Sequence, residues 1–212
     1  IDFAFDNGIN SSKAALYKPI GSRALLKIVR AMSHDTKVKM SQDLLNKIVP
    51  LLSGRLFPFK ECLIEVITEL VGSFTVDQKL IDELKAAAMR QKSVYRAASI
   101  DCFNKIITTS AFNVSKDDLL NIMIDAMENG AIVAQIAAAN CAEIVKDNEK
   151  FGDFINKTYE KMNTIEFENA DAFCKIVLGL PPHEIPSVFN KQKFIKLVTS
   201  SKDKPENVEK FL

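Results

Sequence analysis

The sequence repeats a pair of amphipathic helices with a period of about 36 residues, and this period limits the possible folds more than any other feature. The predicted second helices begin near Phe59, Val94, Ala131 and Phe167, at steps of 35, 37 and 36 residues. A period of this length with two helices per unit is typical of an α-solenoid, in which each repeat buries its apolar face against its neighbours.

The pattern therefore predicts an all-α fold, an α-solenoid of antiparallel helix pairs of the HEAT or armadillo kind, because connections of a few residues favour antiparallel packing. We expect residues 1–212 to form a single HEAT-repeat solenoid fragment cut from a longer protein. The expected parts are a truncated repeat over about 1–35, helix-pair repeats over 36–73, 74–111, 112–147 and 148–180, and C-terminal helices over 181–212.

Apolar stripes with helical spacing predict which side chains form the core. The clearest first-helix stripe contains Leu44, Leu45, Ile48, Val49 and Leu52. A later second helix is expected to bury Val133, Ile136, Ala137, Cys141 and Ile144. Two helix starts are predicted from capping-box spacing, at Thr75 with Gln78 and at Ser115 with Asp118.

Four cysteines recur at intervals of 40, 39 and 33 residues, each within an apolar stretch of a predicted second helix: Cys62, Cys102, Cys141 and Cys174. They are too far apart for a zinc site, whose paired ligands lie two to four residues apart. A chain with a large apolar core also has little need of a disulfide framework. We expect buried, reduced and mutually distant thiols, which favours a cytoplasmic and nuclear protein.

Composition and motifs argue against several classes of function. The chain has 28 basic and 27 acidic residues, so no overall field attracts nucleic acid, and no apolar run is long enough for membrane insertion. Phosphate-binding loops, nucleophile elbows and zinc-protease motifs are missing from the sequence. His34 and His183 are expected in exposed loops, and the carboxylates Glu61, Glu65 and Glu69 on a solvated helix face. We therefore expect no enzyme activity, no cofactor and no metal.

One surface merits attention as a protein-interaction site. The turn at residues 54–60 places two aromatic residues and two cations close together, and a similar set follows one repeat later. If these turns line one edge of the solenoid, they form a contact ridge on a rigid scaffold. The alternative is that the aromatics pack between repeats while the cations are solvated. The ridge residues would be Arg55, Phe57, Lys60, Lys92, Tyr95 and Arg96.

The same turn resembles a known family. Residues 51–63 resemble the Leu-x-Gly-Arg-x-Trp-x-Gly-Lys-Glu-x-Leu stretch near the C-terminus of the giant HEAT-repeat proteasome adaptor and scaffold proteins. Gly54, Arg55, Lys60 and Glu61 match, and Phe57 stands at the tryptophan position, whereas Phe59 replaces the usual glycine. The resemblance implies a non-catalytic scaffold or adaptor that binds the 26S proteasome and tethers core and regulatory particles, whose subunits would be its partners.

An alternative interpretation is another HEAT-repeat protein-binding module, such as a transport receptor, a phosphatase scaffold or a tubulin-binding array. A further expectation concerns the first predicted helix, whose apolar side chains no preceding repeat is guaranteed to cover. The isolated fragment is therefore expected either to self-associate or to gain stability when extended upstream, because the side chains of Ala15, Leu16, Ile20, Leu25 and Ile28 would otherwise be uncovered.

Overall fold

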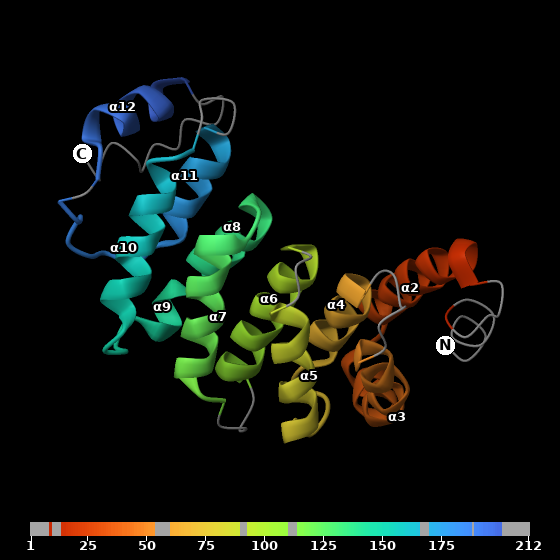
Figure 1. Ribbon diagram of the computed structural model, residues 1–212. Coiled ribbons are helices and arrows are strands. Elements are labelled where there is room, and N and C mark those ends of the chain that lie inside the picture. The colour runs from red at the N-terminus through yellow and green to blue at the C-terminus, as the bar shows by residue number, and fades with distance from the viewer. Residues whose placement is uncertain are drawn as a thin grey trace. The chain divides into compact units, whose positions relative to one another are not determined.

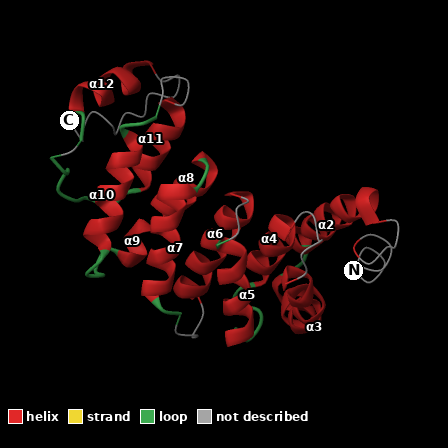
Figure 2. Ribbon diagram, in the orientation of Figure 1, coloured by secondary structure: helices red, strands yellow, loops and turns green. Residues whose placement is uncertain are grey.

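The structure is a computed structural model that describes residues 9, 14–53, 60–89, 93–109, 114–165, 170–187 and 189–200. Within these ranges the regular elements are helices, and no strand occurs (Figures 1 and 2). The predicted all-α class is thus confirmed, and the arrangement is consistent with an α-solenoid.

The chain forms two compact units, Ile1–Val114 and Ser115–Leu212, and their boundary falls close to the predicted repeat boundary at 111/112. The helices of the first unit are α2 (Ala14–Ala31), α3 (His34–Ser53), α4 (Lys60–Leu70), α5 (Gln78–Ala88) and α6 (Ser93–Thr109). Those of the second are α7 (Lys116–Asn129), α8 (Ile132–Asn140), α9 (Ala142–Val145), α10 (Phe151–Met162), α11 (Ala170–Gly179) and α12 (Lys191–Ser200). A single solenoid over all 212 residues stays a prediction.

In the first unit, alternate helices pack against one another. Helix α4 lies between α2 and α6, and α3 packs against both α4 and α5, while α5 also contacts α6 (Figure 1). The predicted stripe of α3 is buried, with Leu44, Ile48 and Leu52 at most 2% exposed. A fully buried leucine or isoleucine stabilises a fold by about 1.5–3 kcal/mol, so these stripes hold the helices together.

All four cysteines are buried free thiols, as the sequence predicts. Burial raises the pKa of the Cys102 thiol to about 12, although a hydrogen bond with Thr68 acts in the opposite direction. Burial and the nearby Glu61 and Glu65 carboxylates likewise raise the pKa of Cys62. Because only the thiolate is nucleophilic, both side chains behave as small apolar residues at neutral pH.

Two helix starts and one loop test the predicted boundaries. Ser115 is the N-cap of α7, and its hydroxyl accepts a hydrogen bond from the backbone N–H of Asp118, as predicted. The prediction for α5 is wrong: Asp77, not Thr75, is the N-cap, and its carboxylate accepts the N–H of Leu80 at 2.8 Å. His34 also lies in a helix, as the first residue of α3, and not in a loop.

In the second unit, α7 packs against α8, α9 and α10, α11 packs against α8 and α12, and α8 also contacts α9. Helix α8 is rich in alanine, and its buried face contains Ala134, Gln135 and Ala138. Val133 is 47% exposed, which contradicts its predicted place in the core. The physical reason is that the buried Gln135 takes the inward position and turns its near neighbour Val133 to the surface.

An aromatic cluster joins α10 to the segment after α11. The hydroxyl of Tyr159 is 2.8 Å from Nε2 of His183, and Nδ1 of His183 is 2.5 Å from the carbonyl oxygen of Pro181. Since that carbonyl can only accept, Nδ1 donates to it, and in the neutral ring Nε2 then accepts from Tyr159. Burial raises the pKa of Tyr159 to about 12, so the phenol stays protonated as this arrangement requires. His183 is therefore half-buried and hydrogen-bonded, not exposed as predicted.

The apolar surface expected on the first helix is present in part. Ile20 and Ile28 of α2 are 62% and 38% exposed, whereas Leu25 is fully buried and belongs to the core. The side chains of Ala15 and Leu16 lie outside the described residues. None of the helices in the described part of the chain combines the length and the apolar character that a membrane crossing needs.

Gly179 allows α11 and α8 to approach closely. A Cβ atom at this position would lie 2.6 Å from Oδ1 of Asn140 and 2.9 Å from the backbone of Ala139 and Asn140. Backbone atoms of a packed helix cannot move aside as the end of a flexible side chain can. The contact between α8 and α11 therefore requires glycine here.

We expect Gly179→Ala to lower the free energy of unfolding by about 1–3 kcal/mol, the usual cost of overpacking. Chemical denaturation followed by circular dichroism measures this change. The matched control is Gly152→Ala in α10, where an added Cβ meets nothing within 4 Å. That variant should be neutral or up to about 1 kcal/mol more stable, because alanine is the better helix former. Equal effects of the two substitutions would contradict the close approach.

Candidate functional site

The structure places three of the six predicted ridge residues. Lys60, Tyr95 and Arg96 are only 1%, 6% and 4% exposed, so they are not surface contact residues, and the ridge prediction is wrong for them. The other three residues, Arg55, Phe57 and Lys92, lie outside the described residues. The ridge stays a prediction for those three alone.

The two buried cations make the same contact in successive helix pairs. Nζ of Lys60, at the start of α4, donates to the carbonyl oxygen of Leu52 near the end of α3, at 2.5 Å. Nε of Arg96, in the first turn of α6, donates to the carbonyl oxygen of Ala88, the last residue of α5, at 2.9 Å. Both side chains reach back eight residues to the C-terminal end of the preceding helix.

This contact has a clear physical cause. The last four carbonyl groups of an α-helix have no intrahelical partner, and that end carries partial negative charge. A hydrogen bond to a charged donor stabilises a protein by about 1.5–3 kcal/mol. Such a bond offsets the cost of removing the cation from water. Lys60 and Arg96 thus serve the fold, and a partner protein cannot reach them without local unfolding.

A third helix pair has a neutral equivalent. Nε2 of the buried Gln135 donates to the carbonyl oxygen of Gly130, the C-cap of α7, at 2.9 Å. Lys60, Arg96 and Gln135 are separated by 36 and 39 residues, close to the repeat period. The sequence signal for this role is a long polar side chain that recurs with the repeat near the start of an otherwise apolar helix.

Exposed charges link α2, α3 and α4. The guanidinium of Arg30 contacts Glu65 at 3.2 Å and Glu69 at 3.1 Å, and Nζ of Lys37 lies 3.9 Å from Glu69. Of the three carboxylates predicted on a solvated face, Glu65 and Glu69 are therefore partly exposed and ion-paired, whereas Oε2 of Glu61 is buried and has no hydrogen-bond partner within the described part of the chain. Exposed pairs of this kind contribute at most about 1 kcal/mol each, so they orient the face more than they stabilise it.

Asp101 on α6 is part of the same charged face. Partial desolvation, followed by repulsion from the Glu65 carboxylate, raises the pKa of Asp101 above its ordinary value. Asp101 is nevertheless an exposed residue, so water screens most of the repulsion between the two carboxylates. The negative charges of Glu65 on α4 and Asp101 on α6 therefore repel each other only weakly.

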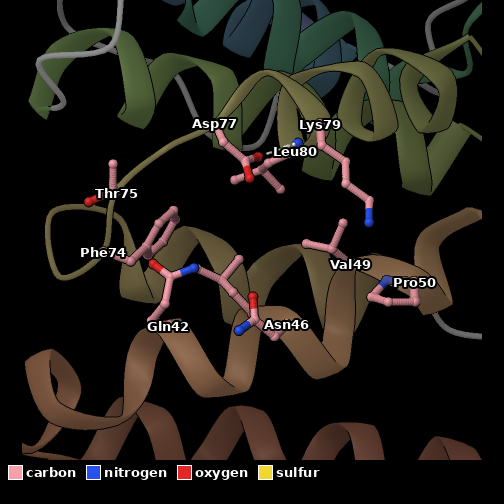
Figure 3. Close-up of a pocket in the computed structure, with 10 residues that line it drawn as sticks. Gln42, Asn46, Val49, Pro50, Phe74, Thr75, Asp77, Lys79 and Leu80 are labelled. Atoms are coloured by element: carbon pink, nitrogen blue, oxygen red, sulfur yellow. Dashed lines mark hydrogen bonds between the residues drawn. The ribbon is translucent and has the colours of Figure 1, made fainter.

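A groove lies between α3 and α5 in the first unit (Figure 3). Its volume is about 300 Å³, and its walls combine apolar, amide and charged side chains. Among the described residues, no group of three or more His, Cys, Asp or Glu side chains is arranged to hold a metal ion. The groove could accept a ligand through hydrogen bonds and apolar contact.

The sequence matches no protein-family model, no curated protein and no solved structure.

We expect Arg96→Met to lower the free energy of unfolding by about 1–3 kcal/mol, because the Ala88 carbonyl loses its charged donor inside the core. Thermal or urea denaturation measures the change. Lys105→Met, on the same helix but half-exposed, should stay within about 0.5 kcal/mol of the parent protein. A neutral Arg96→Met would show that the side chain is not a structural cation.

The raised pKa of Asp101 gives a pH-dependent prediction. A carboxyl whose folded pKa is raised contributes stability below its unfolded pKa, near 3.8, and loses it as pH rises through the folded pKa. Asp101→Asn should therefore raise stability at neutral pH by a few tenths of a kcal/mol, with no gain at about pH 3. Asp43→Asn breaks an exposed pair with Lys47, so it should have the opposite sign at neutral pH. Denaturation curves at the two pH values decide the matter.

Proposed function

We propose that this chain is a non-catalytic scaffold or adaptor built from antiparallel helix-pair repeats of the HEAT or armadillo kind. The observation that carries this proposal is the packing of alternate helices, α2 with α4 and α4 with α6, beside α3 with α5. In the second unit α7 packs with α10 and α8 with α11, which is the same relation when the four-residue α9 is counted with α8. Stacking of neighbouring pairs is how solenoid repeats bury their apolar faces.

The recurring side-chain contact supports the same proposal. Lys60 and Arg96 each bond back to the end of the helix before them, and Gln135 makes the neutral counterpart. A contact that recurs near the repeat period suits a unit that is copied along the chain. It also favours a protein whose conformation, and not a reactive group, performs its function.

The partner we propose is the 26S proteasome, with the chain tethering core and regulatory particles in the cytoplasm and nucleus. The support is the resemblance of residues 51–63 to the giant HEAT-repeat proteasome scaffolds, in which Gly54, Arg55, Lys60 and Glu61 match. Of these four, Lys60 has a structural task. Arg55, with Lys92 one repeat later, is left to act in binding.

The experiment is affinity purification with the tagged 212-residue chain as bait, followed by quantification of co-purifying proteasome subunits. Subunits of both particles should be enriched. Arg55→Glu combined with Lys92→Glu should lower their recovery and leave the melting temperature nearly unchanged. The matched control is Lys39→Glu with Lys116→Glu, two exposed cations outside the turns, which should not lower recovery.

Three results would contradict the proposal. Bait that enriches no proteasome subunit would remove the proposed partner, and enrichment of transport receptors' cargo, phosphatase subunits or tubulin would favour another HEAT-type module. Equal loss of recovery in the ridge double variant and in the control would show that net charge, not the turns, governs binding.

A further inference from the structure

The groove between α3 and α5 is lined from both sides by different chemistry. Gln42, Asn46 and Pro50 line it from α3, and Asp77, Lys79 and Leu80 from the start of α5 (Figure 3). Phe74 lies toward the Gln42 end, and the ammonium group of Lys79 toward the Pro50 end (Figure 3). One groove thus presents apolar surface, two amides and a charge at one end.

The walls of the groove are fixed by the local fold. Gly72, with a φ of 91°, turns the chain after α4 in a conformation that side chains disfavour. The hydroxyl of Ser41 then donates to the carbonyl oxygen of Ser73, which ties this turn to α3. The Asp77 cap starts α5 at the opposite wall. Because both walls are held, the groove exists before a ligand arrives.

The amides of Gln42 and Asn46 are available to a ligand. Both side chains are exposed, and they lie four residues apart on α3, so they face the same side. Among the described residues, neither amide has a hydrogen-bond partner in the protein, and Lys79 has no ion pair. Each amide offers both a donor and an acceptor, as a peptide bond does.

We propose that this groove binds an extended peptide segment of a partner protein. The amides of Gln42 and Asn46 pair with the peptide backbone, an apolar side chain packs on the partly exposed ring of Phe74, and an acidic side chain pairs with Lys79. This inference rests on the groove itself and does not require the partner to be a proteasome subunit.

The dimensions fit a short segment. From Gln42 to Pro50 the α3 wall is about 12 Å long, since a helix rises 1.5 Å per residue. An extended peptide advances about 3.3 Å per residue, so three or four residues fill the groove. Side chains two positions apart point the same way in such a peptide. An apolar residue and an acidic residue separated by one residue would therefore face the groove together.

Other ligands fit less well. The described lining contains one cation, Lys79, beside the Asp77 carboxylate, whereas binding of a nucleic-acid backbone relies on several cations that neutralise phosphates. A free carboxylate could pair with Lys79 but would leave both amides and the ring of Phe74 unused. A peptide satisfies all three kinds of surface.

The experiment titrates the ¹⁵N-labelled full chain with acetyl-Ala-Leu-Ala-Glu-amide and with its reverse-order analogue, acetyl-Glu-Ala-Leu-Ala-amide. One of the two should shift the side-chain amide resonances of Gln42 and Asn46 in a saturable way. Three changes should each weaken that peptide's binding about tenfold: N-methylation of its leucine, Lys79→Glu, and Gln42→Ala combined with Asn46→Ala. Melting temperatures of the variants confirm that the fold is intact.

The matched controls are Lys39→Glu, an exposed cation of α3 outside the groove, and Gln78→Ala, whose amide instead bonds Asp82 at 2.8 Å. Both should bind the peptide as the parent chain does. Three outcomes would overturn the inference: no shift at Gln42 and Asn46 up to about 10 mM peptide, unchanged binding after N-methylation, or equally strong binding of acetate alone.

Discussion

Backbone carbonyls at the end of a helix need partners, and in this chain the next helix begins only a few residues later. Lys60 and Arg96 solve the problem with the same contact, each reaching back eight residues to the helix before it. Gln135 solves it without a charge. The contact fixes both the end of the first helix and the first turn of the second, so the packing of each pair depends on it.

That constraint changes where a binding surface should be sought. Cations near a turn suggest a basic edge, yet Lys60 and Arg96 have donated their hydrogen bonds to the fold and are nearly inaccessible. Polar groups that the fold has not used lie elsewhere, in the groove beside Gln42, Asn46 and Lys79. The charge of a side chain thus does not show whether it can bind a partner protein until the backbone carbonyls near it are known.

Much of the fold could be predicted because helical periodicity is strong over long segments. The second helices α4, α6 and α8 begin within one residue of their predicted starts, and the α3 stripe is buried throughout. Errors arose where two local solutions compete. Thr75 and Asp77 can both cap a helix, and only Asp77 is positioned to accept the N–H of Leu80. The direction of the Arg96 side chain could not be predicted either, since a long side chain can extend to water or fold back to a carbonyl.

The groove could not be predicted because its parts are distant in sequence. Gln42 and Lys79 belong to different helices, and only the Gly72 turn with the Ser41 contact brings their walls together. No motif marks such a site, since exposed amides on a helix are common and carry no pattern of their own. The groove exists only because α3 packs against α5.

The eight-residue reach of Lys60 and Arg96 also bears on how the chain folds. Bringing together two groups only eight residues apart costs little conformational entropy. A helix pair can therefore form this hydrogen bond before any distant segment of the chain has packed. Contacts of this kind keep the contact order low, which is the property of chains that fold fast. Each pair can then act as a nucleus on which the next helix condenses, and synthesis on the ribosome would release such nuclei one after another.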